Sequence, residues 1–133
     1  MRARLALFAC NITCELREVV LRDKPKQMVD ISPKSTVPVL ELMNGTVIDE
    51  SRDIIIWAVA QNDRNGWQSY LQETKELVEI NDHQFNTHLD KYKYSSRNPE
   101  LSKDEHRKNG DFFLKLLNDK LTGQSFLSAD ELT

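Results

Sequence analysis

Two cysteines, Cys10 and Cys14, are candidates for a thiolate nucleophile. Their spacing of four residues matches neither the C-x-x-C redox motif nor a zinc knuckle, so a pair of reduced thiols is the expected state. A thiolate nucleophile is the less favoured alternative, because no helix N-terminus or cation is placed to activate either sulfur. We therefore assign no catalytic residue.

The histidines could act as metal ligands or proton carriers, and their spacing argues against a metal site. His83, His88 and His106 include no pair at i, i+4. Glu79 and His83 share a helical face, but two ligands do not make a zinc site, and a surface pair is the favoured interpretation. No metal is predicted.

A third group that could do chemistry is the run Asp49-Glu50-Ser51, which lies two residues before an apolar segment at residues 54–61. Oxygen-bearing side chains at this position are typical of helix capping, which the residues alone favour. The alternative is an anion site, since the start of a helix offers backbone N–H groups beside the Ser51 hydroxyl.

The elements that must position these residues follow from hydrophobic pattern and turn chemistry. Residues 3–10 predict a helix, residues 17–21 a strand, and residues 26–31 a short helix that Ser32-Pro33 stops. Residues 36–49 predict a hairpin with a type I′ turn at Asn44-Gly45, and Pro38 at its head is a candidate for a cis peptide bond.

The second half of the chain reads as all helix. Apolar residues recur every seven positions from residue 68 to residue 94, although Asn81 and Asp82 interrupt that face. A further helix starts near Lys103 and ends at Thr122-Gly123, and its apolar side is expected to hold Phe112, Phe113, Leu116, Leu117 and Leu121. Residues 62–66 form the linker, so domains are expected at 1–63 and 67–133.

Composition excludes several classes of function. The 133 residues carry 18 Lys and Arg against 21 Asp and Glu, a net charge of −3 without the basic stripe of a nucleic-acid binder. The longest apolar run, at residues 54–60, is far shorter than the roughly 20 residues that cross a bilayer. We expect a cytoplasmic protein with neither nucleic-acid nor membrane partners.

Several motifs together resemble the glutathione S-transferase family, in its bacterial and omega-like branches. They are Leu21-Arg22-Asp23-Lys24-Pro25, the run Ser32-Pro33-Lys34-Ser35-Thr36-Val37-Pro38-Val39-Leu40, the stretch from Gly45 to Trp57, and the runs at residues 81–85 and 89–94. The resemblance covers nearly the whole chain. It implies an α/β thioredoxin-like N-terminal portion followed by an all-α portion.

The resemblance also implies a ligand and the residues that hold it. Glutathione, as co-substrate, would contact Lys24, pair with the main chain at Val37-Pro38, and place its γ-glutamyl carboxylate at Ser51 and its ammonium at Glu50. The second substrate would be a small electrophile or a disulfide, and a homodimer is expected.

The chain departs from the family pattern at both ends. Members begin with a strand that precedes the catalytic segment, whereas Met1 here already falls in the first helix, and residues 126–133 resemble the loop before the next helix of the family. The resemblance therefore implies an internal portion of a longer transferase, lacking the first strand. We expect impaired conjugation or thiol–disulfide exchange, or alternatively a non-catalytic protein-interaction module resembling the stringent starvation proteins.

Overall fold

The computed structural model describes residues 1–97 and 99–128, and the chain divides into two compact units, Met1–Gln68 and Ser69–Thr133. The domains expected at 1–63 and 67–133 stay a prediction. Of the expected break at residues 97–99, residue 98 lies outside the described residues, as do residues 129–133 of the expected C-terminal loop. No helix in the described part combines the length and the apolar character needed to span a bilayer.

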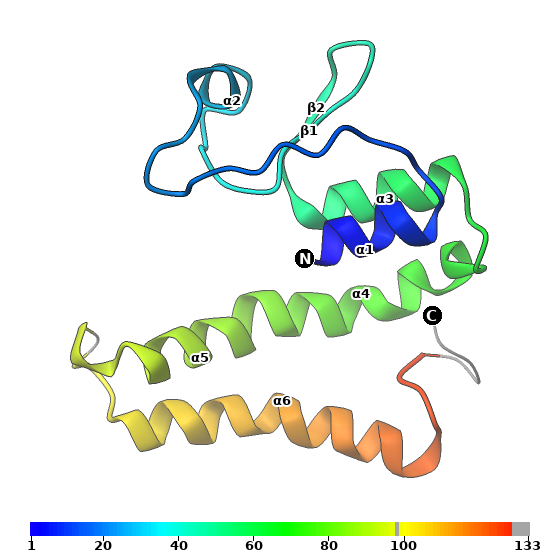
Figure 1. Ribbon diagram of the computed structural model, residues 1–133. Coiled ribbons are helices and arrows are strands. Elements are labelled where there is room, and N and C mark those ends of the chain that lie inside the picture. Colours follow the sequence, from blue (N-terminus) through cyan, green and yellow to red (C-terminus); the bar gives the residue numbers. More distant parts are fainter. Residues whose placement is uncertain (98, 129–133) are drawn as a thin grey trace. The chain divides into compact units, whose positions relative to one another are not determined.

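The core of unit 1 lies between two helices, α1 (Arg2–Ala9) and α3 (Ser51–Gln61), which lie side by side (Figure 1). Helix α1 contributes small and apolar residues at helical spacing, so that one face of it packs closely against α3. The buried apolar residues are Ala3, Ala6, Leu7 and Cys10, together with Ile54, Ala58 and Val59 of α3. The helices predicted at residues 3–10 and 54–61 are therefore both present.

The predicted hairpin is present, but its turn differs from the expected one. Strand β1 (Leu40–Glu41) pairs antiparallel with β2 (Val47–Ile48). Gly45 has φ +83°, whereas Asn44 is not among the residues with positive φ, so the type I′ prediction is wrong. The Gly45 N–H donates to Leu42 O at 2.9 Å, which closes a three-residue loop of the type that ends in a glycine bulge. The Asn44 side chain accepts the Thr46 N–H at 3.0 Å, and this local bond stabilises the alternative turn.

The strand predicted at residues 17–21 is wrong. Its one ladder contact is an isolated bridge between Val20 and Asp23, where the Asp23 N–H donates to Val20 O at 3.0 Å. A strand needs the backbone of a neighbour, and within the described residues the sheet consists of β1 and β2. The segment therefore turns back on itself and leads into α2 (Lys26–Ile31), which matches the predicted helix.

The first long helix of unit 2 follows the predicted range with an internal change of pitch. It runs through a 3-10 turn η1 (Trp67–Tyr70), α4 (Leu71–Ile80), a π-helical turn η2 (Asn81–Phe85) and α5 (Asn86–Lys93). The π turn begins where the sequence interrupts the apolar face with Asn81 and Asp82. The prediction of one helix over residues 68–94 is confirmed in extent, with η2 as a local departure from α geometry.

After the short turn η3 (Ser95–Arg97), helix α6 (Lys103–Gly123) packs along α5 and η2 (Figure 1). A capping box of Ser102 and Glu105 starts it. Phe113 is buried and its ring lies 5.4 Å from that of Phe85. The expected apolar side is corrected at Phe112 and Leu121, which are 61% and 46% exposed. Consecutive helical residues point about 100° apart, so burying Phe113 turns Phe112 outward.

Candidate functional site

A cluster of charged and hydroxyl side chains surrounds the start of α3. The Asp49 carboxylate accepts a hydrogen bond from Ser32 Oγ at 2.9 Å and one from Lys34 Nζ at 3.1 Å. Lys34 Nζ also donates to Glu50 Oε1 at 2.9 Å. Ser32 is 1% exposed, so its hydroxyl anchors the cluster to the interior of unit 1. We call Ser32, Lys34, Asp49 and Glu50 the acidic cradle.

The contacts of the acidic cradle favour its charged states. The hydrogen bond from Ser32, followed by the one from Lys34, lowers the pKa of Asp49. The hydrogen bonds to Glu50 and then Asp49 raise the pKa of Lys34. By formal charge, the carboxylates of Asp49 and Glu50 and the ammonium of Lys34 give the cradle one net negative charge.

Ser51 is the first residue of α3, and Arg2 lies beside it. Arg2 Nε donates to Ser51 Oγ at 3.0 Å, which joins the starts of α1 and α3. The residue preceding the helix is Glu50, and α3 has no side-chain capping bond, so the expected capping role of the Asp49, Glu50 and Ser51 oxygens is wrong. Their oxygens take up other partners, and the first-turn amides of α3 have no intrahelical acceptor.

The Val37-Pro38 peptide bond is cis, as predicted. It follows Ser35, whose φ is +53°, and Val37 is 47% exposed. Lys24 is partly buried in the turn before α2. Within the described residues, the hydrogen bonds and ion pairs of the acidic cradle involve none of the expected site residues Lys24, Val37 and Pro38.

Three residues of this region were not singled out from the sequence as site residues. Ser32 and Lys34 lie within a quoted motif, and their position directly after α2 was the available signal, because loop residues next to a helix end often carry function. Arg2 carried no signal, since nothing in the sequence brings it near Ser51, 49 residues away.

The cysteines are both free thiols in different environments. Cys10 is 1% exposed, and burial, followed by the negative charge of Asp63, raises the pKa of its thiol. The Asn62 side-chain amide donates to the Cys10 carbonyl at 2.8 Å, which ties the ends of α1 and α3 together. Cys14 is exposed beyond the end of α1. The position of Cys10 disfavours thiolate chemistry.

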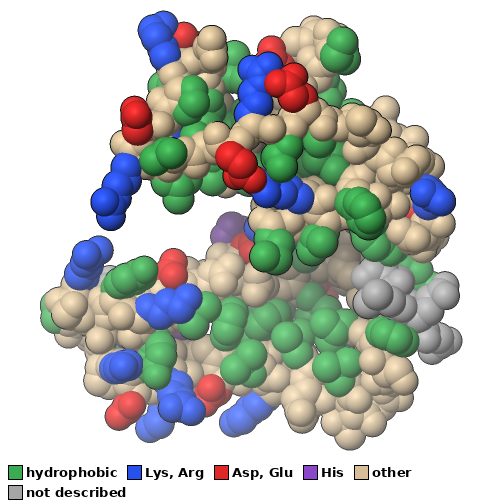
Figure 2. Space-filling model, viewed as in Figure 1, with side chains coloured by type: hydrophobic (Ala, Val, Ile, Leu, Met, Phe, Trp, Pro, Cys, Tyr) green, Lys and Arg blue, Asp and Glu red, His purple; other side chains and the backbone are tan. Residues whose placement is uncertain are grey.

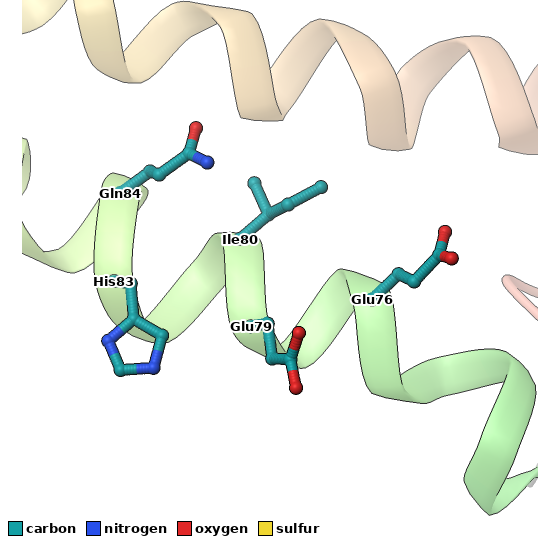
Figure 3. A pocket seen from close by; sticks show the side chains of 5 residues that line it. All are labelled: Glu76, Glu79, Ile80, His83 and Gln84. Atoms are coloured by element: carbon teal, nitrogen blue, oxygen red, sulfur yellow. The ribbon is translucent and has the colours of Figure 1, made fainter.

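Two hollows among the described residues of unit 2 differ in character. One of about 400 Å³ lies on α4 and η2, where Glu79 and His83 project from one side of the helix and Ile80 and Gln84 from the other (Figure 3). In residues 1–97 and 99–128 no three His, Cys, Asp or Glu side chains gather as a metal site. The other hollow, of about 480 Å³, lies between α4 and α6, where hydrophobic side chains gather in Figure 2. Leu77, Val78 and Phe113 are among its lining residues.

The chain shares the fold of solved glutathione S-transferases, with a thioredoxin-like N-terminal part and a helical remainder. Residues 1–61 match the family model of the glutathione S-transferase N-terminal domain. No curated protein matches the chain.

Solved structures share this fold at low sequence identity. Glutathione S-transferase 1-6 from Anopheles dirus species B is 20% identical with a TM-score of 0.81, and the match covers 99% of this chain and 66% of that one. The bacterial glutathione S-transferase BphK, solved as a ternary complex, is 18% identical with a TM-score of 0.75, covering 99% and 70%. A glutathione S-transferase-I bound to lactoylglutathione is 19% identical with a TM-score of 0.70, covering 99% and 70%. The chain thus spans about two thirds of the length of these proteins.

Proposed function

We propose that this chain is part of a glutathione S-transferase of the bacterial or omega-like branch and that unit 1 binds glutathione. The observation that carries the proposal is the clustering of Glu50, Ser51 and Lys34 at the start of α3. The match of residues 1–61 to the family's N-terminal domain model supports it, as does the lactoylglutathione bound to one of the structural neighbours.

The chemistry of the cluster suits the γ-glutamyl end of glutathione, which carries one carboxylate and one ammonium. The carboxylate fits the start of α3, where the Ser51 hydroxyl and the first-turn amides can donate to it and the helix dipole is positive. The ammonium fits Glu50, an exposed carboxylate directly before the helix. Opposite charges on the ligand thus meet suitable partners on adjacent residues.

The middle of the tripeptide is an extended backbone, for which we propose the main chain of Val37 as partner. Pairing of an extended peptide with an exposed main chain is a common recognition mode. Val37 is exposed and precedes the cis peptide bond to Pro38. Lys24, at the turn before α2, is proposed as a further glutathione contact on the strength of the family motif.

For the whole protein we propose conjugation of glutathione to a small electrophile, or exchange with a disulfide, by a cytoplasmic homodimer. Within this chain we propose binding without thiol activation, and impaired turnover as a result. Cys10 is buried and the pKa of its thiol is raised, so it is a poor nucleophile at neutral pH.

Calorimetric titration of the chain with reduced glutathione tests this proposal. Ser51→Ala and Glu50→Gln each remove one partner of the γ-glutamyl group, and a hydrogen bond to a charged group contributes about 1.5–3 kcal/mol, so each variant should bind at least tenfold more weakly. Glu41→Gln, an exposed change in β1 of the same unit, is the matched control and should bind as the unchanged chain does. Equal affinity for all four proteins would contradict the proposed contacts of Glu50 and Ser51, and no binding by any of them would contradict the proposed function and favour the non-catalytic interaction module.

A further inference from the structure

The contact between Arg2 and Ser51 determines whether the Ser51 hydroxyl can donate or accept a further hydrogen bond. A guanidinium only donates hydrogen bonds, so at 3.0 Å from Arg2 Nε the Ser51 Oγ must be the acceptor. A hydroxyl has one proton and two lone pairs. With one lone pair taken by Arg2, the hydroxyl proton is directed away from the guanidinium and is left to donate to another group.

The position of Arg2 is held by the packing of its helix. Arg2 is the first residue of α1 and Ser51 is the first residue of α3. Directly inside this pair, Ala3 is 4% exposed and Ile54 is 1% exposed, and both belong to the core where α1 packs on α3. The contact therefore links two helix starts whose separation is fixed by buried side chains rather than by loops.

The charge of Arg2 also matters at this place. The acidic cradle has one net negative charge, which would repel an incoming carboxylate. Arg2 adds a positive charge next to Ser51, and the partial positive charge of the helix start also favours an anion.

We propose that Arg2 is a positioning residue of the glutathione site, which holds the Ser51 hydroxyl as a donor towards the γ-glutamyl carboxylate and offsets the charge of the acidic cradle. The inference rests on the proposed function, because it concerns the same subsite. It gives α1 a role in ligand binding, in addition to the direct contacts proposed for Ser51 and Glu50. Lysine would restore the charge of Arg2 but not the orientation of the Ser51 hydroxyl, since its ammonium is a mobile point charge without the planar fork that orients Nε.

The test compares two ligands in calorimetric titrations. One is reduced glutathione, and the other is 4-aminobutanoyl-cysteinylglycine, which keeps the ammonium and lacks only the γ-glutamyl carboxylate. Arg2→Gln should weaken glutathione binding roughly tenfold, the effect of losing one bond linked to a charged group, and leave the affinity for the analogue unchanged. Arg2→Lys should recover part of the loss at low salt and little of it at high salt, because only the charge is restored.

Two comparisons separate positioning from a general effect on stability. Arg4→Gln removes an exposed arginine of the same helix, whose ion pair is with Glu18 at 2.8 Å, and should leave both affinities unchanged. In the double variant at high salt, where the charge of Arg2 is screened, Arg2→Gln should add less than twofold to the effect of Ser51→Ala, because residues that act through one contact are not additive.

The outcomes distinguish this inference from the proposed function. If the unchanged chain binds no glutathione, the proposed function fails and the inference fails with it. If Ser51→Ala weakens binding but Arg2→Gln does not, or if Arg2→Gln weakens both ligands equally, the glutathione site stands and the role of Arg2 is refuted.

Discussion

Asp49 connects the residues around the start of α3 through its carboxylate. It accepts from the buried hydroxyl of Ser32 and from the ammonium of Lys34, and it lies directly before the helix. Because both donors favour the ionised form, the pKa of Asp49 lies below its usual value. Its contacts thereby couple the folding of unit 1 to pH.

The coupling predicts a loss of stability in acid that Asp49→Asn should reduce. A carboxyl group with a lowered pKa in the folded state stabilises the fold above its unfolded value of about 3.9, and this contribution disappears as the pH falls through the folded value. Urea denaturation at pH 7, 5, 4 and 3 measures the effect. The unchanged chain should be more stable than the variant at pH 7, and the difference should shrink below about pH 4.

Asp119→Asn, an exposed change on α6, is the control and should leave the pH dependence unchanged. A difference between the chain and Asp49→Asn that stays constant from pH 7 to pH 3 would contradict the coupling.

A second prediction at the residue scale concerns the protons of two histidines in unit 2. The Nδ1 atoms of His88 and His106 lie 3.2 Å apart, and the buried Nε2 of His106 has no hydrogen-bond partner in the described residues. An orphaned buried N–H is rarer in proteins than an under-satisfied acceptor. We therefore expect His106 to carry its proton on Nδ1 and donate it to Nδ1 of His88.

Nitrogen-15 NMR at alkaline pH identifies the tautomer, since protonated and bare ring nitrogens have different shifts. His106 should show a protonated Nδ1 and His88 a protonated Nε2. His88→Ala should destabilise unit 2 by about 1–3 kcal/mol, because it leaves the buried Nδ1–H of His106 without its acceptor. A proton on Nε2 of His106 would show that the assignment is reversed.

The candidate site could be predicted from the sequence only where its residues are neighbours in the chain. Glu50 and Ser51 are adjacent and precede an apolar helix, so their proximity needs no tertiary information. Ser32, Lys34 and Arg2 meet them only because α1, α2 and the hairpin fold together. The sequence pattern does not encode such distances without knowledge of the packing.

At the scale of elements, Gly110 shows how the contact between two helices limits a side chain. It lies inside α6, and a Cβ built there would lie 3.7 Å from the Phe85 ring, an ordinary van der Waals distance. Gly110→Ala should therefore stabilise unit 2 by about 0.5–1 kcal/mol, because glycine costs about this much relative to alanine within a helix. Thermal or urea unfolding followed by circular dichroism measures the change.

Gly45→Ala is the opposite case and serves as the control. No atom lies within 4 Å of a Cβ built at Gly45, but its φ of +83° strains any residue with a Cβ, so this substitution should destabilise. If Gly110→Ala destabilises unit 2 as well, the space between Gly110 and the Phe85 ring does not admit a Cβ, contrary to the 3.7 Å distance between the built Cβ and the ring.

Elements that depend on local signals were predicted well, and those that depend on partners were not. The short helix α2 has its stop in Ser32-Pro33, and α6 has its start in the Ser102 capping box, so both bounds follow from nearby residues. The strand at residues 17–21 failed because β-branched residues pair only if a neighbouring strand is present. The hairpin was right in place and wrong in turn type, since Asn44-Gly45 fits two turns and the Asn44 side chain selects between them.

At the scale of the whole molecule, the division into two units predicts where glutathione acts. A ligand that binds the folded state stabilises it by mass action, about 1.4 kcal/mol at ten times the dissociation constant. Since every proposed contact lies in Met1–Gln68, amide hydrogen exchange should slow in that unit, most of all at the start of α3 and around Val37. Exchange in residues 69–128 should be unchanged, as measured by mass spectrometry with and without glutathione.

The dipeptide cysteinylglycine is a suitable comparison ligand, because it lacks the whole γ-glutamyl group. Cysteinylglycine should leave exchange at the start of α3 unaltered. Protection centred on residues 69–128 would place the binding site in the wrong unit.

The π turn at Asn81–Phe85 has an evolutionary consequence for unit 2. A π turn accommodates one residue more than a regular α-helical path, so loss of a single codon there could restore an unbroken α-helix. Because each residue advances the helix by about 100°, every side chain after the deletion would rotate by that amount, and His88 would leave the face that meets His106 on α6. The lineage of this chain can thus change which side chains meet α6 by inserting or deleting one triplet, without altering the identity of any residue that makes the contact.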